Sequence, residues 1–489
     1  MFEAAEVGDA LSKEKYKALA QKLRVELLEA QRELATSRLS LVVVIGGVEG
    51  AGRGELANLL LTWLDARGVE THAYDEPTDE ERERPFFWRY WRELPAAGRA
   101  ALMFGSWYTE PIVRRAFKKL DSKDFERHLD RVADFERMLA RENVVLVKLW
   151  LHITKKEQKR RFKALEKDPN EAWRVTKADW KFHERYDRFR EVCEHALIKT
   201  NSPESPWQVV EATDRRYRDA TCARLILDAL RRRLAEAKDA KRAPTPDRPK
   251  PKPHNLLQRL DLKKKLGDKE FEDKLEELQG RVGTLTRKLR KKGRSLILGF
   301  EGPDAAGKGG AIRRLSAAMD AKLYAVKSIS APTDEERSHP YLWRFWRALP
   351  RQGRVTIYDR TWYGRVLVER VEGFAAPEEW KRAYSEINGF EEQLHDFGTI
   401  VLKFWIEISP QEELRRFKDR QVTPYKQYKL TEEDWRNRQK WDAYQAAACE
   451  MIERTSTAHA PWVLVEGEDK NWARVKILKA VAERLEDEL

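Results

Sequence analysis

The chain has 489 residues, which is too long for one ordinary hydrophobic core and allows roughly two to four domains. Hydrophobic residues make up 41% of it, and no apolar run approaches the roughly 18 residues that cross a bilayer, which excludes a membrane-spanning protein. Lys and Arg outnumber Asp and Glu by 95 to 82, a net charge of +13 that fits a polyanionic partner but also ordinary solvated helix faces.

The N-terminus and the cysteines bear on location. Residues 1–40 are charged and helix-forming, without the apolar stretch and small-residue cleavage site of a secretory signal. Cys193, Cys222 and Cys449 are too few and too scattered for a disulfide framework or a CxxC metal site. Both features predict a cytoplasmic protein with no membrane partner.

The first half opens with an amphipathic stretch that predicts a helix over Lys13–Ala35. An apolar stretch then predicts a strand over Leu39–Ile45, and a longer one predicts a strand over Val144–Ile153. Thr154 stands three residues before a glutamate, a capping-box spacing that predicts the start of a helix.

The second half shows the same order of elements. Its patterns predict a helix over Lys269–Lys291, a strand over Ser295–Phe300 and a helix over Gly310–Met319. Strands are also predicted over Val355–Tyr358 and Ile400–Ile408, and Ser409-Pro-Gln-Glu then predicts another helix start. Strands that alternate with helices predict an α/β fold, in which helices cover both faces of a parallel sheet.

The two halves match each other at a constant spacing of 255 residues. GVEGAGRG begins at Gly47 and GPDAAGKG at Gly302, while PTDEER begins at both Pro77 and Pro332. The same spacing relates further pairs, namely Trp107-Tyr108 with Trp362-Tyr363, Phe135-Glu136 with Phe390-Glu391, and Pro206-Trp207 with Pro461-Trp462. A chance match of this length is not credible, so the chain is a fused tandem of two homologous domains.

A linker is predicted between the halves. Residues Ala243–Pro253 read APTPDRPKPKP, a proline-rich and charged composition that is typical of an extended segment. We therefore place a first domain over residues 1–240, the linker over 241–258 and a second domain over 259–489.

The second half contains a phosphate-binding loop. Gly302-Pro-Asp-Ala-Ala-Gly307-Lys308-Gly309 lies between a predicted strand and a predicted helix, as the GxxxxGK motif requires. Its glycines let successive N–H groups point at one anion, and the helix N-terminus adds partial positive charge. Lys308 would reach the transferring phosphoryl group. The alternative is a plain glycine-rich turn, against which the lysine and the flanking elements argue.

Gly309 stands where a Ser or Thr usually binds Mg²⁺ in such loops. The metal then needs other hard oxygen ligands, and carboxylates are the natural ones. Asp304 lies inside the loop, and Asp359 ends a predicted strand as a Walker-B aspartate does. Each alone could be a cap or turn residue, but together with Lys308 they predict a magnesium and phosphate site.

Arginines follow this constellation. Arg360 and Arg365 come at the carboxyl end of the predicted strand, where open α/β sheets place ligands, and guanidinium groups suit phosphate. Arg416 and Arg420 are four residues apart, on one face of a predicted helix. A solvated helix would have the same pattern, so these two residues alone do not decide the function.

The second half also contains a recognisable series of segments, in the order GPDAAGKGG, YDRTWYGR, EINGFE at Glu386–Glu391, LKFWIEIS followed by RRF, and TSTAHAPW at Thr455–Trp462. This series resembles the polyphosphate kinase 2 family, and the tandem arrangement resembles its two-domain members, which transfer phosphate from polyphosphate to AMP. The resemblance covers nearly all of both halves outside the linker and the first helix.

The resemblance implies a P-loop kinase fold with a helical lid in each half. It implies Mg²⁺-dependent transfer of a terminal phosphoryl group from inorganic polyphosphate to AMP, giving ADP, with polyphosphate and an adenine nucleotide as partners rather than nucleic acid. The catalytic residues are then Lys308, Asp304, Asp359 and Arg360, with the two aspartates as metal ligands. Phosphate and nucleotide contacts are expected from Gly302, Gly307, Lys308, Gly309, Arg365, Arg416 and Arg420. A homo-oligomer is compatible with the sequence.

The first half departs from the pattern where the chemistry would occur. At the spacing of 255, Arg53, Glu49, Phe104 and Gly105 stand for Lys308, Asp304, Asp359 and Arg360 respectively. A phenylalanine cannot bind a metal, and arginine does not replace lysine at a crowded phosphate site. The first half is therefore predicted to be a degenerate, inactive copy.

Other functions remain open from the residues alone. An NTP-dependent nucleotide kinase, or a polyphosphate-dependent kinase of nucleoside diphosphates, would contain nearly the same elements. Basic charge and 17 tryptophans would also fit a nucleic-acid-binding protein. However, Trp88 and Trp91, like Trp343 and Trp346, have helical spacing that favours core or cleft positions. The preferred nucleotide and the direction of transfer are not indicated.

Overall fold

The computed structural model describes residues 1–240, 256–424, 427 and 432–489. These form two compact units, one of Met1–Thr78, Phe87–Thr245 and Pro332–Arg347, the other of Asp79–Phe86, Pro246–Ala331 and Ala348–Leu489. The predicted linker segment Ala243–Pro253 lies outside the described residues, and the domain boundaries given above stay predictions.

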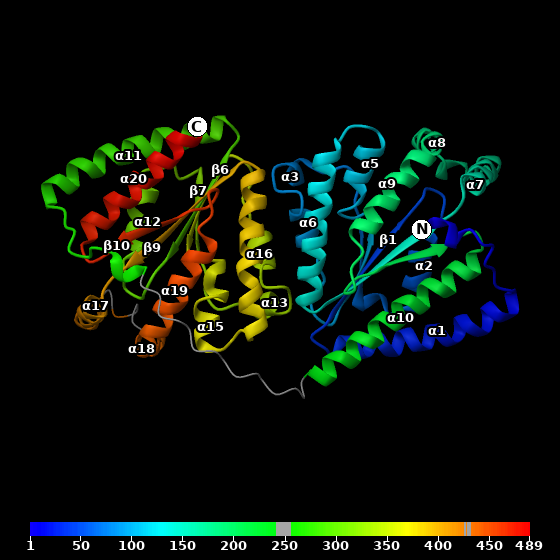
Figure 1. Cartoon of the computed structure of the whole chain (residues 1–489), viewed down its shortest axis with the longest axis horizontal. Helices are drawn as coiled ribbons and strands as arrows, with labels where there is room; N and C mark the ends of the chain where they lie inside the picture. Colours follow the sequence, from blue (N-terminus) through cyan, green and yellow to red (C-terminus); the bar gives the residue numbers. More distant parts are fainter. Residues whose placement is uncertain (241–255, 425–426, 428–431) are drawn as a thin grey trace. The chain divides into compact units, whose positions relative to one another are not determined.

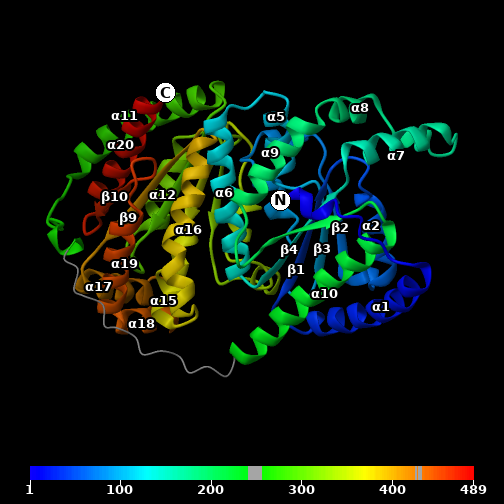
Figure 2. The ribbon, with the colours of Figure 1, turned by 45° about the vertical axis from the view of Figure 1, so that its right-hand side comes forward.

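The first half of the sequence forms a parallel five-stranded sheet with the strand order β2-β3-β1-β4-β5. Helix α10 packs against α1, α2 and β4, and α6 packs against β4 and α9; Figure 2 shows α1 and α10 side by side. Its elements are η1 Phe2–Ala5, α1 Lys13–Ala35, β1 Ser40–Gly47, α2 Arg53–Trp63, η2 Ala66–Gly68, β2 Val69–Ala73, α3 Asp79–Arg82, α4 Trp88–Arg92, β3 Ala100–Phe104, α5 Thr109–Ala116, α6 Ser122–Arg141, β4 Val144–His152, α7 Lys155–Lys167, η3 Ala172–Arg174, α8 Lys177–Glu184, α9 Tyr186–Lys199, β5 Trp207–Glu211 and α10 Arg215–Ala240.

The second half forms an equivalent parallel sheet with the strand order β10-β9-β6-β8-β7. Helix α20 packs with α11 and α12, whereas α16 packs with β9 and α19; Figure 1 shows α11 beside α20. Its elements are η4 Leu257–Arg259, α11 Asp268–Lys291, β6 Ser295–Glu301, α12 Lys308–Ala317, β7 Tyr324–Ser328, α13 Asp334–Arg337, α14 Trp343–Trp346, β8 Val355–Asp359, η5 Trp362–Arg365, α15 Val368–Glu372, α16 Pro377–Asp396, β9 Thr399–Glu407, α17 Pro410–Val422, α18 Glu432–Gln439, α19 Trp441–Thr455, β10 Trp462–Glu466 and α20 Lys470–Glu488.

The strand register decides which side chains meet in the second half. Central strand β6 pairs with β8, so that Phe300 lies opposite Asp359, and with β9, so that Glu301 lies opposite Trp405. Because the three strands are parallel, their carboxyl ends meet at one edge of the sheet, where open α/β sheets place ligands. The loop after β6 and Asp359 are thereby brought together.

Both halves contain the same buried ion pair between a strand and a helix, from β9 to α16 in the second half and from β4 to α6 in the first. Lys403 Nζ lies 2.7 Å from Glu391 in the second half, and Lys148 Nζ lies 2.6 Å from Glu136 in the first. In each half the glutamate also accepts hydrogen bonds from a tryptophan and a tyrosine. Groups buried this deeply need such partners, and the repeat keeps all of them.

The predicted α/β fold and the tandem repeat are confirmed. The helix predicted over Gly310–Met319 begins earlier, at Lys308, because left-handed Gly307 (φ 113°) forms its N-cap. Thr154 and Ser409 cap their helices as predicted, but the return half of each capping box is replaced, since Glu157 and Glu412 bind arginines of their own helices instead.

Three further predictions concern the cysteines, the paired tryptophans and membrane-spanning helices. Within the described residues the three cysteines form no disulfide, and all three are buried. The four tryptophans with helical spacing, Trp88, Trp91, Trp343 and Trp346, are buried as well, so they are not a surface platform for bases. No helix within the described ranges combines the length and the apolar character needed to cross a bilayer.

Candidate functional site

The loop between β6 and α12 has the curled backbone of a phosphate-binding loop. Gly302 and Gly307 have φ angles of 143° and 113°, and Ala305 has a φ of 60°. A Cβ on Gly302 would lie 2.4 Å from the carbonyl oxygen of Ile406, so only glycine fits there. The loop then feeds directly into the N-terminus of α12, which is a favourable place for an anion.

Lys308 lies at the centre of the loop. Its Nζ donates hydrogen bonds to the carbonyl oxygens of Gly302 at 2.8 Å and Pro303 at 3.0 Å. Burial lowers the pKa of Lys308, and the nearby charge of Arg360 lowers it further against the opposing carboxylates. A bound anion would favour its charged form.

Asp304 is held from two sides. Its Oδ1 accepts a hydrogen bond from Arg360 at 2.9 Å, and its Oδ2 accepts one from Asn437 Nδ2 at 2.9 Å. Burial opposes ionisation, but the charges of Lys308 and Arg360 outweigh it and lower the pKa of Asp304. The carboxylate is therefore charged at neutral pH.

Asp359 and Arg360 follow at the end of β8. Arg360 has a left-handed backbone (φ 64°), and its N–H donates to the carbonyl oxygen of Phe300 at 3.1 Å. Next to them, buried Glu301 accepts two hydrogen bonds of 2.7 Å from the N–H and hydroxyl of Thr361. Glu301 was not predicted; an acid in the last position of a strand before the loop was the available signal.

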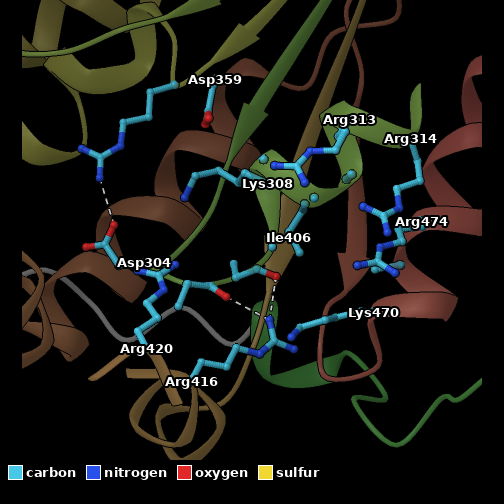
Figure 3. A pocket seen from close by; sticks show the side chains of 18 of the residues that line it. Asp304, Lys308, Arg313, Arg314, Asp359, Ile406, Arg416, Arg420, Lys470 and Arg474 are labelled. Atoms are coloured by element: carbon cyan, nitrogen blue, oxygen red, sulfur yellow. Dashed lines mark hydrogen bonds and ion pairs between the residues drawn. The ribbon is translucent and has the colours of Figure 1, made fainter. Parts of the chain in front are cut away.

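This loop lines a basic cavity of about 560 Å³ (Figure 3). Cationic side chains in its lining are twice as many as carboxylates, which makes it suited to a polyanion. The cations are Lys308, Arg313, Arg314, Arg360, Arg416, Arg420, Lys470 and Arg474, and the carboxylates are Asp304, Asp359, Asp419 and Asp434.

Four of these cations, Arg313, Arg314, Lys470 and Arg474, were missed by the sequence prediction. Burial lowers the pKa of Arg474, and the positive charges of Arg314 and Arg416 lower it further, a crowding that an anion would relieve. The repeat contained a signal for these cations. Their counterparts at a spacing of 255 are Asn58, Leu59, Arg215 and Asp219, so only Lys470 has a basic counterpart in the first half.

Arg416 is placed beneath the loop, although it was predicted as a phosphate contact. Its guanidinium is 4% exposed and lies 2.5 Å from Glu412. Its remaining N–H groups donate to four backbone carbonyls at 2.7–2.9 Å, those of Ala305, Ala306, Gly467 and Glu468. The side chain joins the loop to the segment after β10.

Arg161 makes equivalent contacts in the first half. It pairs with Glu157 at 2.8 Å and donates to the carbonyls of Gly50, Ala212 and Thr213, which stand 255 residues before Ala305, Gly467 and Glu468. The first half therefore keeps the contacts of Arg416, although it has an arginine in place of Lys308 and a phenylalanine in place of Asp359.

The other predicted residues divide into two groups. Arg420, Gly307 and Gly309 line the basic cavity together with Lys308. Arg365 pairs with Glu369 at 2.9 Å and with Glu379 at 3.8 Å instead. Arg365 is not among the residues that line the basic cavity.

A second, smaller cavity of about 90 Å³ adjoins the first and shares Asp304 and Arg360 with it. It has room for about half a dozen waters, or for a flat ring system of similar size. Its lining also includes apolar and aromatic side chains with a few polar groups among them, namely Leu367, Val368, Trp405, Trp441, Tyr444, Glu413 and Gln445.

A polar network beside this cavity has no counterpart in the first half. The Tyr444 hydroxyl lies 3.2 Å from Asn437 Oδ1 and 3.5 Å from Glu372 Oε1, and Asn437 holds Asp304. The residues 255 positions earlier are all phenylalanines whose rings contact one another, with centroids 5.2 Å apart for Phe117 and Phe182 and 5.8 Å apart for Phe182 and Phe189.

In the first half, the side chain of an arginine lies against the loop. Buried Arg218 donates to the carbonyl oxygen of Ala51 at 3.2 Å and pairs with Asp219 at 2.7 Å. Its Nη1 lies 1.7 Å from where a Cβ on Gly52 would be. The counterpart of Arg218 in the second half is Ala473, which lines the basic cavity.

Comparisons with known proteins agree with this geometry. The chain is 48% identical to a polyphosphate:AMP phosphotransferase of Pseudomonas aeruginosa over 99% of both chains, and 37% identical to one of Acinetobacter johnsonii over 95% of this chain and 96% of that one. A crystal structure described as a polyphosphate kinase 2 from Pseudomonas aeruginosa matches 100% of this chain and 99% of that one, with a TM-score of 0.90 and 45% identity. The family model "Polyphosphate kinase 2" matches residues 10–238 and 265–489, so the chain belongs to the polyphosphate kinase 2 family.

Proposed function

We propose that this protein transfers the terminal phosphoryl group of inorganic polyphosphate to AMP, giving ADP and a polyphosphate shorter by one unit. One observation carries the proposal: a basic cavity and a smaller, largely apolar cavity meet at Asp304 and Arg360, beside the Lys308 loop. The full-length relatives that the chain resembles are named for this reaction.

The basic cavity is the place for the donor. A polyphosphate chain carries negative charge on each phosphate, and it needs cations along its length rather than at one end. Arg313 and Arg314 on α12 and Lys470 and Arg474 on α20 extend the positive lining away from Lys308, as Figure 3 shows. A mononucleotide alone would not require this extension.

The smaller cavity is the place for the acceptor nucleoside. Trp405, Trp441 and Tyr444 offer rings and edges to a purine, and the shared residues Asp304 and Arg360 lie toward the phosphates. This arrangement would direct the phosphate of AMP toward the loop while its base lies among aromatic side chains.

The carboxylates fit a magnesium ion that uses substrate oxygens as further ligands. Among the described residues, no group of three or more His, Cys, Asp or Glu side chains forms a closed metal cage. Mg²⁺ is commonly bound by one or two carboxylates plus substrate phosphates, and Asp304 and Asp359 line the same cavity. When bound, the ion would neutralise charge that develops on the transferring phosphoryl group.

The chain itself contributes positioning and charge to the reaction. An oxygen of the AMP phosphate attacks the terminal phosphorus of polyphosphate, and the bond to the bridging oxygen breaks in line, leaving that oxygen on the shortened chain. No general base is needed, because the attacking phosphate is already ionised. Lys308 and Arg360 stabilise the transferring group. Arg416 holds the loop in place by donating hydrogen bonds to the carbonyl oxygens of Ala305 and Ala306.

We assign no transfer activity to the first half. Arg218 and the Glu49–Arg53 pair fill its loop region, and Phe117, Phe182 and Phe189 stand in place of the polar network. We propose the cytoplasm as the location, in keeping with three buried cysteines that form no disulfide in the described part of the chain.

The test is a panel of donors and acceptors. Purified protein with Mg²⁺ is given polyphosphate or ATP as sole donor and AMP, ADP, GMP or GDP as acceptor, and products are separated by chromatography. ADP formed from AMP and polyphosphate is expected. Product formed with ATP but not with polyphosphate would support an NTP-dependent nucleotide kinase instead.

A further inference from the structure

A buried carboxylate fixes the orientation of an amide in the smaller cavity. Glu407, the last residue of β9, is 5% exposed. Its Oε2 accepts a hydrogen bond of 2.6 Å from Trp405 Nε1, and its Oε1 accepts one of 2.8 Å from Gln445 Nε2. Both partners of Glu407 line the smaller cavity.

This contact determines which atom of the amide is the acceptor. Rotating the Gln445 amide by half a turn would place its carbonyl oxygen against the Glu407 carboxylate, which has no proton to donate when ionised. While Glu407 is ionised, the amide is thus held with Nε2 toward Glu407, and Oε1 is left as the hydrogen-bond acceptor on the other side of the same group.

We propose that Gln445, oriented by Glu407, selects the purine of the acceptor by its 6-substituent, accepting from the 6-amino group of adenine and disfavouring a 6-oxo group. The proposal rests on the proposed function, in which the acceptor base occupies the smaller cavity. A carboxamide can pair with adenine through its N6 donor and a ring nitrogen, as glutamine does in nucleic-acid recognition. A 6-oxo purine presents an acceptor to Oε1 instead, and the held amide cannot turn to meet it.

The first half agrees with this role. The counterparts of Glu407 and Gln445 are His152 and Arg190, and they no longer form a carboxylate–amide pair. His152 Nε2 lies 2.7 Å from Glu6, and Arg190 pairs with Glu3. The pair is therefore lost in the half whose equivalent region contains the phenylalanine cluster.

The experiment measures binding rather than turnover. AMP and inosine monophosphate differ at position 6 and in the adjacent ring protonation, and purine riboside monophosphate lacks the 6-substituent altogether. Dissociation constants are measured for all three by calorimetry at pH 8, above the pKa of about 7 to which burial raises Glu407. The wild type should bind AMP about tenfold to a hundredfold more tightly than inosine monophosphate, the range expected for one well-placed bidentate contact.

The variants separate recognition from packing. Gln445→Leu should lower the preference for AMP over inosine monophosphate to within about threefold, and Glu407→Gln should lower it by letting the amide turn. Val368→Ala, in the wall of the same cavity, should weaken both nucleotides by a similar factor and keep their ratio. Arg190→Ala, at the position of Gln445 in the first half, should change neither.

Two outcomes would overturn the inference, and they are distinguishable. A preference for AMP that survives in both Gln445→Leu and Glu407→Gln would mean that other groups recognise position 6, while the proposed function still holds. If the wild type binds polyphosphate but none of the three nucleotides, the acceptor of the proposed function is wrong and the inference falls with it.

Discussion

Glu49 and Arg53 form an ion pair of 2.5 Å within the first-half loop, at the positions that Asp304 and Lys308 hold in the second half. In the second half the lysine and the aspartate instead lie in a cavity with other charges around them, and the aspartate is held by Arg360 and Asn437. In the first half the two side chains neutralise each other's charge, although they are only four residues apart in the sequence. The two loops therefore share a backbone motif but not an anion site.

Lys308→Ala should abolish phosphoryl transfer, whereas Arg53→Ala should leave most of it. Removing one preorganised cation from a transferring group typically lowers the turnover number by about a hundredfold to a thousandfold. Steady-state rates with polyphosphate and AMP measure both variants, and circular dichroism verifies that they are folded. Comparable losses in the two variants would show that the first half takes part in catalysis.

The sequence predicted the features that depend on local pattern and on the repeat. Apolar runs located the central strands within a residue or two, and the GxxxxGK spacing located the loop and Lys308. Asp304, Asp359, Arg360 and Arg420 are brought together around one cavity as expected. These predictions succeeded because strand ends and a loop next to them must share one edge of a parallel sheet.

Side-chain destinations on helices were harder to predict. Arg416 and Arg420 share a helix face and both line the basic cavity, yet Arg416 also turns under the loop to reach four carbonyls. Arg474 and Gln445 are far from the loop in sequence, and only the packing of α20 and α19 brings them near. Spacing along one helix does not contain that information.

Asp304→Asn and Asp359→Asn should each raise the Mg²⁺ concentration needed for half-maximal rate and lower the turnover number. A neutral amide is a weaker ligand than a carboxylate, and these two acids replace the hydroxyl that Gly309 lacks. Asp419→Asn is the matched control, because Asp419 lines the same cavity but pairs with Arg415. A magnesium titration that is unchanged in both test variants would remove the assignment.

Arg416→Ala should lower the free energy of unfolding by about 3 kcal/mol, because four backbone carbonyls and Glu412 lose a charged donor. Arg161→Ala should destabilise the protein by a similar amount while leaving the transfer rate of the remaining folded protein nearly unchanged. Chemical unfolding and rates at low temperature measure the two effects. If Arg416→Ala raises the KM for polyphosphate without loss of stability, Arg416 is a direct polymer ligand.

Stability should fall as pH rises from 5 to 8, in part because of Glu407. Burial raises its pKa to about 7, and the negative charge of neighbouring Glu413 acts in the same direction. The protonated form is favoured in the folded state, so its stabilising contribution is complete below the unfolded pKa and is lost as pH passes about 7. The shift corresponds to a loss of up to about 3 kcal/mol.

Glu407→Gln tests this directly, since the amide cannot ionise. Its free energy of unfolding should decline less between pH 5 and pH 8 than that of the wild type. Glu413, whose pKa burial also raises to about 7, should continue to contribute a decline of the same sign in this variant. Parallel pH curves for the variant and the wild type would mean that Glu407 does not titrate in this range.

The last prediction concerns the donor and the cations beyond the loop. Arg314, Arg420 and Arg474 line the basic cavity, and the charge of Arg314 beside Arg474 is already unfavourable without an anion. Replacing any one of these arginines by Ala should weaken the binding of polyphosphate about fivefold to tenfold and change AMP binding by less than about twofold. It should also reduce the number of counterions released when polyphosphate binds, and hence the slope of the salt dependence, by roughly one. Arg215→Ala, at the first-half counterpart of Lys470, is the control and should leave polyphosphate binding unchanged. Dissociation constants for both ligands across a salt series decide the matter: if AMP weakens and polyphosphate does not, these arginines bind the nucleotide and the polymer runs elsewhere.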